Sequence, residues 1–224
     1  MYRHELKLSI NALDRAVLSS RLSKVLPRDP HSGPGGTYTV RSIYFDDDRD
    51  TALLQKLTGQ LYREKFRLRT YGRDSGVIYL ERKIKRGNLG CKEKARLSRD
   101  QCLRLLAGDH RFLLDRPEAV CRALYAKMAT GLFRPRTIVE YDREAYVWEP
   151  GRVRITIDSN LRTGLRSADF LNFDLKLAPV VGRAVSVLEI KYRGFIPIHI
   201  LNLVQLESRG VDSISKYVLG RRFG

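Results

Sequence analysis

Charged residues recur at every second position in several segments of this chain, and this period constrains the fold more than any other feature. In the run 63–69 the odd-numbered residues are all basic, and Phe66 and Leu68 lie between them. Residues two apart share one face of a β-strand, so the run predicts a strand with one basic and one apolar face. The basic residues of the run are Arg63, Lys65, Arg67 and Arg69.

The same alternation returns in five further segments. A strand with one charged and one apolar face is usually half-buried, with its charges in water. Six such strands, dominated by Arg and Lys with single Glu residues, favour instead an antiparallel barrel whose charged face points inward and whose apolar face packs on outer helices. Like charges repel in such an interior, so it would hold water or bound anions and serve a function. The further charged positions are Glu5, Lys7, Glu81, Lys83, Lys85, Lys92, Lys94, Arg96, Arg152, Arg154, Glu189, Lys191 and Arg193.

The excess of basic residues predicts an anionic partner. Lys and Arg total 42 against 25 Asp and Glu, a formal net charge of +17 in 224 residues. Nucleic acid, an anionic membrane and a phosphate-rich small molecule all satisfy this charge. The length predicts a single domain over residues 1–224.

Cysteine usage and hydropathy predict a cytoplasmic protein. Cys91, Cys102 and Cys121 show no CxxC spacing, so neither a disulfide framework nor a zinc site is expected. Free cysteines fit a reducing compartment. The N-terminus does not resemble a signal peptide, and no apolar run approaches the roughly 20 residues of a transmembrane helix.

Turn and capping signals divide the chain into mostly antiparallel strands with helices at the ends and in two insertions. Strands are expected over 2–10, 38–45, 61–71, 76–85, 90–97, 135–147, 151–158 and 183–193. Asn11 is expected to cap a helix that ends at Pro27, and Ser98 with Gln101 forms a capping box at the start of another. Further helices are expected after the turn 46–48 up to Gly59, over 116–130, over 197–207 and from Ser213 or Ser215 to Leu219. The stretch 167–180 could be a strand or a lid.

The sequence lacks the glycine-rich phosphate-binding loops GxxxxGK[ST] and GxGxxG, so side chains would have to hold phosphates. Arg suits this because its planar fork donates paired hydrogen bonds to phosphate oxygens. Glu5, Glu81 and Glu189 each precede a lysine by two residues. Each could pair with neighbouring cations to reduce repulsion, or hold Mg²⁺ or Mn²⁺ together with substrate phosphates.

The absence of a clear nucleophile and base favours transfer to a phosphate acceptor. Such an acceptor is already ionised at neutral pH, so the reaction needs positioning and charge neutralisation more than proton abstraction. A hydrolase would have to orient a water molecule, with Glu5 or Glu81 as the candidates. Ser215 beside Lys216 is more suited to a phosphate contact than to a nucleophile pair.

At these residues the chain resembles the polyphosphate polymerase domain of the VTC (vacuolar transporter chaperone) family, which belongs to the triphosphate tunnel metalloenzymes and is related to CYTH domains. The resemblance implies an α+β fold, an antiparallel eight-stranded β tunnel barrel with a charged interior and flanking helices. It implies transfer of the ATP γ-phosphate onto a polyphosphate chain, with a divalent metal that is typically Mn²⁺. The segments that carry it are YRHELKL, VRSIYFD, KFRLRTYG, YLERKIKRG, KEKARL, VEYDREAY, VRITIDSNL, VLEIKYRG and SKYVL.

The resemblance also implies roles for individual residues. The set expected to act on the phosphates in catalysis is Lys7, Arg67, Arg69, Lys83, Lys94, Arg143, Arg154 and Lys216. The expected substrate-binding set is Tyr141, Ser215, Lys191 and Glu81, and the expected metal ligands are Glu189 and Glu5. The wider superfamily often begins with ExExK, whereas this chain has Arg3 at the first Glu, which shifts the expected metal site toward Glu189 and makes a water-activating hydrolase less favoured.

Two alternatives to a polymerase remain open at this point. One is a tripolyphosphatase or nucleoside triphosphatase that uses the same tunnel. The other is a non-catalytic polyanion-binding module, which is less favoured because the aromatic residues lie mostly on apolar faces and carboxylates interrupt the cations. The expected partners are ATP and inorganic polyphosphate rather than nucleic acid. Coupling to a membrane would need a membrane-protein partner in trans, with this protein in a peripheral position at the inner face of the membrane.

Overall fold

The structure, a computed structural model, describes residues 4–33, 35–73, 76–87, 89–180, 185–206 and 214–221. By its internal contacts the chain forms two compact units. Unit 1 comprises Met1–Thr39, Tyr141–Arg162 and Pro179–Ser215, and unit 2 comprises Val40–Glu140, Thr163–Ala178 and Lys216–Gly224. The prediction of a single domain over 1–224 stays a prediction.

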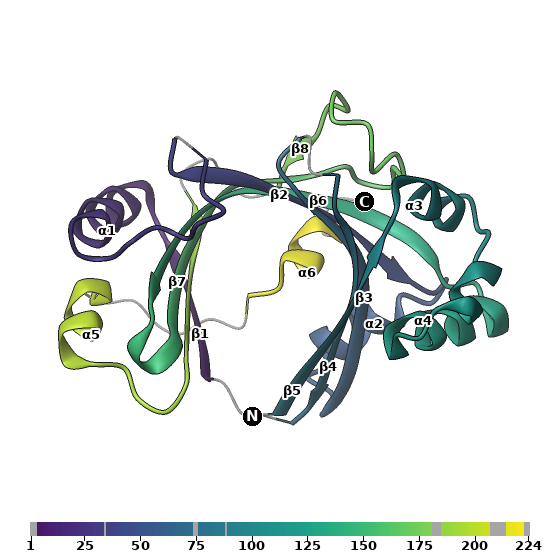
Figure 1. Ribbon diagram of the computed structural model, residues 1–224, viewed down its shortest axis with the longest axis horizontal. Coiled ribbons are helices and arrows are strands. Elements are labelled where there is room, and N and C mark those ends of the chain that lie inside the picture. Colours follow the sequence, from purple (N-terminus) through teal and green to yellow (C-terminus); the bar gives the residue numbers. More distant parts are fainter. Residues whose placement is uncertain are drawn as a thin grey trace. The chain divides into compact units, whose positions relative to one another are not determined.

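The described strands form an antiparallel sheet in the order β1-β9-β7-β6-β2-β3-β4-β5, and the short β8 pairs with β7. The strands are β1 (His4–Ile10), β2 (Thr37–Asp46), β3 (Tyr62–Tyr71), β4 (Ile78–Arg86), β5 (Leu89–Leu97), β6 (Arg134–Trp148), β7 (Val153–Thr163), β8 (Ala178–Pro179) and β9 (Ser186–Tyr192). The helices are α1 (Ala12–Val25), α2 (Thr51–Leu57), α3 (Arg99–Leu106), α4 (Ala119–Thr130), α5 (Ile198–Val204) and α6 (Lys216–Arg221), with 3-10 turns η1 (Arg111–Asp115) and η2 (Pro150–Arg152) (Figure 1). The predicted α+β class, with eight antiparallel strands and flanking helices, is confirmed.

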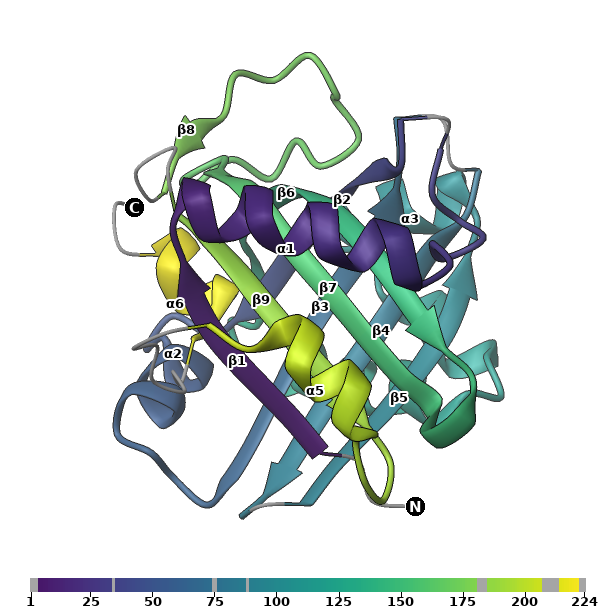
Figure 2. The same cartoon turned by 90° about the vertical axis from the view of Figure 1, so that its left-hand side faces the viewer.

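In unit 1, helices α1 and α5 cover the apolar face of β1, β9 and β7 (Figure 2). The predicted alternation places Leu188 and Ile190 of β9 and Ile155 of β7 on this face, where they are buried against Leu18 and Leu22 of α1. The charged residues of the same strands therefore lie on the opposite face.

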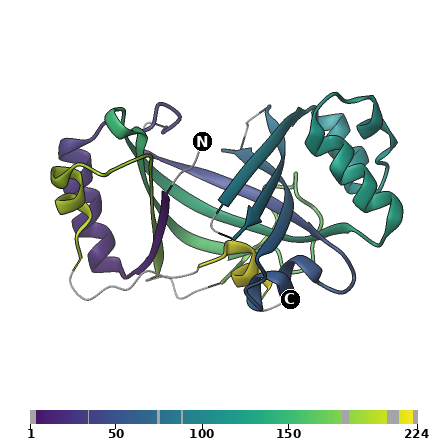
Figure 3. The ribbon, with the colours of Figure 1, turned by 90° about the horizontal axis from the view of Figure 1, so that it is seen from below.

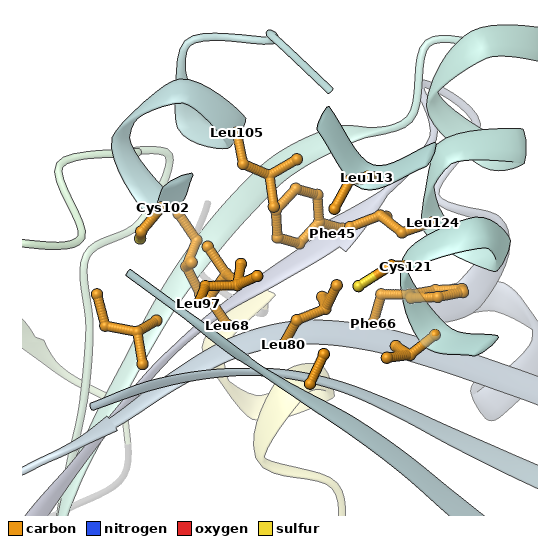
Figure 4. Close-up of a cluster of buried hydrophobic side chains, with 14 of the residues drawn as sticks. Phe45, Phe66, Leu68, Leu80, Leu97, Cys102, Leu105, Leu113, Cys121 and Leu124 are labelled. Atoms are coloured by element: carbon orange, nitrogen blue, oxygen red, sulfur yellow. The ribbon is translucent and has the colours of Figure 1, made fainter. Parts of the chain in front are cut away.

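In unit 2, the apolar face of β2 to β5 packs against α3, η1 and α4. Figure 4 shows Phe45, Phe66 and Leu80 of the strands meeting Leu105 and Leu124 of the helices. Helix α6 lies on the other side of β3 to β5 from α3 and α4 (Figure 1), and it contacts α2, which is drawn in blue beside the yellow α6 in Figure 3. The basic face of this sheet is thus the face that α6 approaches.

Local signals set most of the boundaries. The Asn11 side chain accepts a hydrogen bond from the Asp14 backbone N–H, and the Asn11 backbone N–H donates one to the Asp14 carboxylate in return, so the predicted N-cap of α1 is confirmed. The capping box of Ser98 and Gln101 is confirmed in the same way. The helix expected over 116–130 begins only at Ala119, because the residue before a proline avoids the helical region, and the residue before Pro117 is extended.

The bounds of other expected elements differ from the prediction. Helix α5 covers 198–204 of the expected 197–207, and α6 runs from Lys216 to Arg221. Strand β7 runs on to Thr163, five residues past its expected end. Residues 2, 3, 183, 184, 207 and 213, on which parts of the predicted strands and helices fall, lie outside the described residues.

The stretch 167–180 is not a strand along most of its length, since only residues 178–179 form a strand, and the expectation of a lid stays a prediction. Its Phe170 is completely buried in the core of unit 2. Arg41, which is 1% exposed, donates hydrogen bonds to the carbonyl oxygens of Phe170 and Asn172 and pairs with Glu140. A buried guanidinium needs such partners, and it ties this stretch to β2.

Candidate functional site

The charged face of unit 2 consists of rows of side chains that face one another across neighbouring strands. Tyr44 of β2 is opposite Arg67 of β3, which is opposite Glu81 of β4, which is opposite Lys94 of β5. A second row places Lys65, Lys83 and Lys92 side by side in the same three strands β3 to β5. The period-two pattern of the sequence therefore becomes a two-dimensional basic surface.

Glu81 is the carboxylate around which this surface is organised. It is 3% exposed, and its Oε2 lies 2.6 Å from Arg67 Nη2 and 3.8 Å from Arg69 Nη1. Lys92 Nζ contacts its other oxygen. Burial alone would raise the pKa of Glu81, but the charges of Arg67, Arg69 and Lys92 outweigh it and hold the pKa well below its usual range. The carboxylate is therefore ionised at any physiological pH.

Aromatic rings lie beneath several of these cations. Lys94 Nζ is 5.2 Å from the centre of the Tyr79 ring, and the Arg67 guanidinium is 5.8 Å from that of Tyr44. Lys65 lies 5.1 Å from the ring of Tyr217. Cation–π contacts of this kind hold the cations in place without neutralising them.

Helix α6 brings Lys216 to the same face of unit 2. Tyr217 donates a hydrogen bond of 2.6 Å to the buried Asp46, and its ring stacks on Tyr44 at a centroid distance of 5.0 Å. Gly220 allows the close approach, because a Cβ there would lie 2.6 Å from Val139 Cγ2. Lys216 is near enough to Tyr44 for its charge to act on the phenol. Ser215, which directly precedes α6, is half-buried.

In unit 1, Glu189 of β9 is the carboxylate that the cations surround. Its Oε1 lies 3.5 Å from Lys7 Nζ, its Oε2 lies 4.0 Å from Arg143 Nη2, and Lys191 contacts it directly. Lys7 also pairs with Glu5 at 2.7 Å. Burial opposes protonation of Lys7, but Glu189 and Glu5 outweigh it and raise the pKa of this amine. Burial lowers the pKa of Lys191 to about 8 in spite of the same carboxylates.

Arg143 of β6 is fixed by a bidentate ion pair. Its Nε and Nη2 donate to the two carboxylate oxygens of Asp158 at 2.6 and 2.8 Å, and the Tyr141 hydroxyl lies 3.4 Å from Nη2. Burial would lower the pKa of Arg143, but the charges around it, Asp158 and Glu189 among them, hold the pKa well above its usual value. Asp158 of the VRITID segment is a partner that the sequence reading did not single out.

Arg154 of β7 belongs to the charged face of unit 1 but has its own partners. It pairs with Asp29 at 2.6 Å and donates to the Tyr38 hydroxyl at 3.1 Å. Its Cα lies opposite that of Lys191 in the sheet. Asp29 lies in the loop after α1, so only the folded chain reveals this anchor.

The structure thus groups the predicted residues by unit. Within unit 1, Glu189 contacts Lys7, Lys191 and Arg143. The predicted site residues on unit 1 are Glu5, Lys7, Tyr141, Arg143, Arg154, Glu189, Lys191 and Ser215, and those on unit 2 are Arg67, Arg69, Glu81, Lys83, Lys94 and Lys216. Their roles stay predictions.

A divalent metal fits the carboxylates of unit 1 only if phosphates complete its shell. Across the described ranges, no group of three or more His, Cys, Asp and Glu side chains could hold a metal ion. Glu5 and Glu189, however, both contact Lys7 Nζ, so oxygens from β1 and β9 converge on one point. Mg²⁺ prefers an octahedral oxygen shell and is commonly bound by one or two carboxylates plus substrate phosphates. This donor set meets that requirement.

None of the helices in the described part of the chain has the length and apolar character needed to cross a membrane. No curated protein sequence matches the chain significantly.

The fold is shared with proteins of very different sequence. The Hippeastrum protein HpAC1, provisionally named an adenylyl cyclase and described as having a dominant triphosphatase activity, is 14% identical and superposes with a TM-score of 0.59 over 98% of this chain and 95% of its own. A Bacillus halodurans protein provisionally named an adenylate cyclase is 13% identical, with a TM-score of 0.50 over 91% and 87% of the two chains. These likenesses show that the chain shares its fold with both proteins.

The sequence identifies the family within that fold class. The model of the VTC domain matches residues 2–223, nearly the whole chain. The chain belongs to the VTC domain family, and the resemblance seen in the sequence is confirmed.

Proposed function

We propose that this protein is a polyphosphate polymerase, an ATP–polyphosphate phosphotransferase that moves the γ-phosphate of ATP onto an inorganic polyphosphate chain. One observation carries the proposal: a chain that matches the VTC domain over 2–223 has β-strands whose cations surround single buried carboxylates. Such surfaces hold polyanions. Membership of the family and the fold together favour an enzyme that acts on triphosphates or polyphosphate.

The cations of unit 2 would bind phosphates directly. Arg67 and Arg69 hold Glu81, and each guanidinium has several N–H donors, so a phosphate can be bound while contact with Glu81 is kept. Lys83 and Lys94 are exposed on the same face and would add point charges. Lys216, at the start of α6, would extend this surface, with Ser215 as a further phosphate contact.

The cluster of unit 1 would bind phosphates together with a divalent ion. Glu189 and Glu5 would hold Mn²⁺ or Mg²⁺, which when bound would neutralise the charge of phosphate oxygens. Lys7, Lys191 and Arg143 would contact phosphate oxygens, with Tyr141 beside Arg143. Arg154, held by Asp29, is the remaining cation of this face.

The chain needs no general base for this reaction. The terminal phosphate of polyphosphate is ionised at neutral pH, so the cations have only to align it with the γ-phosphate and neutralise the charge of both. That requirement agrees with the charged face of each unit, where Arg and Lys predominate and cations hold the carboxylate.

The test is product analysis with γ-labelled ATP. The purified protein is incubated with the nucleotide and Mn²⁺, and the products are separated on a polyacrylamide gel. A nuclease-resistant ladder of labelled chains supports the polymerase. The Arg82→Ala variant is the matched control, because Arg82 lies on the apolar face of β4 with Glu64 and should retain the ladder.

A tripolyphosphatase or nucleoside triphosphatase is the second candidate, because the Hippeastrum protein of the same fold is described as having a dominant triphosphatase activity. Labelled orthophosphate without a ladder would favour it. Tight triphosphate binding with neither product would favour a polyanion-binding module. ATP and polyphosphate are the proposed partners, and a membrane protein in trans and a peripheral location stay predictions.

A further inference from the structure

Tyr44 carries a hydrogen-bond donor that the described residues do not use. Its side chain lies on the charged face of β2 and is 6% exposed. The hydroxyl oxygen accepts a hydrogen bond of 3.0 Å from Arg67 Nη1. Among the described residues, the phenol makes no other hydrogen bond. A hydroxyl can donate as well as accept. The hydroxyl hydrogen of Tyr44 therefore has no acceptor among the described residues. A buried donor without an acceptor is energetically unfavourable, so a ligand atom that accepts this hydrogen would be stabilised here.

The surroundings of this hydroxyl select an anionic acceptor. Burial would raise the pKa of Tyr44, but the positive charges of Arg67, Arg69 and Lys216 outweigh it and lower the pKa. The nearby carboxylate of Glu81 is held by Arg67, Arg69 and Lys92. An acceptor that enters this position meets three cations and one buried O–H donor, which suits a phosphate oxygen.

The ring that carries the hydroxyl is held in place. It stacks on Tyr217 at 5.0 Å with an interplanar angle of 30°, and the Arg67 guanidinium lies over it at 5.8 Å. The Tyr217 hydroxyl is itself fixed by Asp46. A donor that is already oriented loses little freedom when a ligand binds, so its hydrogen bond contributes more to affinity.

We propose that Tyr44 is a substrate-binding residue that donates its hydroxyl hydrogen to a phosphate oxygen of the triphosphate or polyphosphate. This assignment rests on the proposed function, since it takes a phosphate chain as the substrate of this face. The competing role is a purely positioning one, in which Tyr44 only orients Arg67.

The first experiment removes the hydroxyl and keeps the ring. Tyr44→Phe preserves the stacking on Tyr217, and an unchanged melting temperature verifies that the variant is folded. Titration calorimetry with inorganic tripolyphosphate should give a dissociation constant about tenfold higher than that of the wild type, the loss expected for a hydrogen bond to a charged group. The matched control is Tyr125→Phe on α4, whose ring lies against His110, and its affinity should not change.

The second experiment separates direct binding from positioning by a double-mutant cycle. If Tyr44 acts only through Arg67, Tyr44→Phe does not change the affinity for tripolyphosphate once Arg67 is replaced by Ala. A direct donor still loses about tenfold in that background. Low ionic strength keeps the weakened Arg67→Ala complex measurable. Equal affinities of Arg67→Ala with and without Tyr44→Phe overturn the proposal.

The two proposals fail separately. A wild-type protein that neither binds tripolyphosphate nor elongates polyphosphate contradicts the proposed function and the Tyr44 assignment together. A wild-type protein that binds and elongates normally, with a Tyr44→Phe variant of equal affinity, contradicts the Tyr44 assignment alone.

Discussion

Replacing Glu81 by glutamine tests whether the buried carboxylate neutralises the basic face of unit 2. The substitution keeps the shape of the side chain and removes the charge that Arg67, Arg69 and Lys92 contact. Removal of one partner from a buried ion pair costs about 3–5 kcal/mol. Because Arg67 and Lys92 are 21% and 48% exposed and therefore partly screened, we expect the smaller loss of about 2–3 kcal/mol in the free energy of unfolding.

The assay is thermal unfolding with and without tripolyphosphate. For a chain of this length each kcal/mol corresponds to roughly 2–4 °C, so the melting temperature of Glu81→Gln should fall by about 5–10 °C without ligand. Bound phosphate supplies the missing negative charge, so tripolyphosphate should raise the melting temperature of the variant more than that of the wild type.

A matched control lies in the same strands. Glu93 contacts Arg82 at 3.4 Å on the other face of β4 and β5 and is 27% exposed, so Glu93→Gln should cost less than about 1 kcal/mol. If the melting temperature of Glu81→Gln equals or exceeds that of the wild type without ligand, the idea that this carboxylate holds the cations together is wrong.

Four further perturbations have defined outcomes. Arg67→Ala should abolish polyphosphate synthesis while circular dichroism stays that of the wild type; an unfolded variant would point to a structural ion pair instead. Glu189→Gln should weaken the Mn²⁺ dependence of turnover, and an unchanged metal titration would exclude Glu189 as a ligand. Cys91 is exposed, whereas burial raises the pKa of the Cys121 thiol to about 11 and keeps it protonated at neutral pH. A thiol reagent should therefore modify Cys91 before Cys121, which mass spectrometry of the peptides would detect. Tyr217→Phe removes the hydrogen bond to Asp46 that anchors α6, so it should lower the free energy of unfolding by about 1–2 kcal/mol. The variant should also bind tripolyphosphate more weakly, because Lys216 is displaced. Wild-type affinity would argue against a role for α6 in binding.

The sequence predicted the strands and their faces because alternation is a local signal. Once Phe66 and Leu68 are assigned to the apolar face, the positions of Arg67 and Arg69 follow without any knowledge of the neighbouring strands. The caps of α1 and α3 were predictable for the same reason, since each needs only residues three apart.

The partners across strands could not be predicted, because they depend on register. That Glu81 lies between Arg67 and Lys94 requires the pairing of three strands, and a slip of one residue would place it on the other face. The anchors of Arg143 and Arg154 are Asp158 and Asp29, which are distant in the sequence. Nothing local identifies them.

Two aromatic residues were missed although one carried a signal. Tyr44 shares the parity of Ser42 in the segment VRSIYFD, so a strand over 38–45 places it on one face with Ser42, and its pairing with β3 makes that the basic face. The contacts of Tyr217 depend on where α6 packs. Long-range contacts of this kind are not encoded in any window of the sequence.

The most direct test of the central claim is ³¹P NMR of the reaction of the purified protein with ATP and Mn²⁺. The account predicts that ADP forms together with the resonance of internal phosphates of a growing chain, and that Arg67→Ala abolishes both. Orthophosphate as the only product besides ADP would contradict a polymerase.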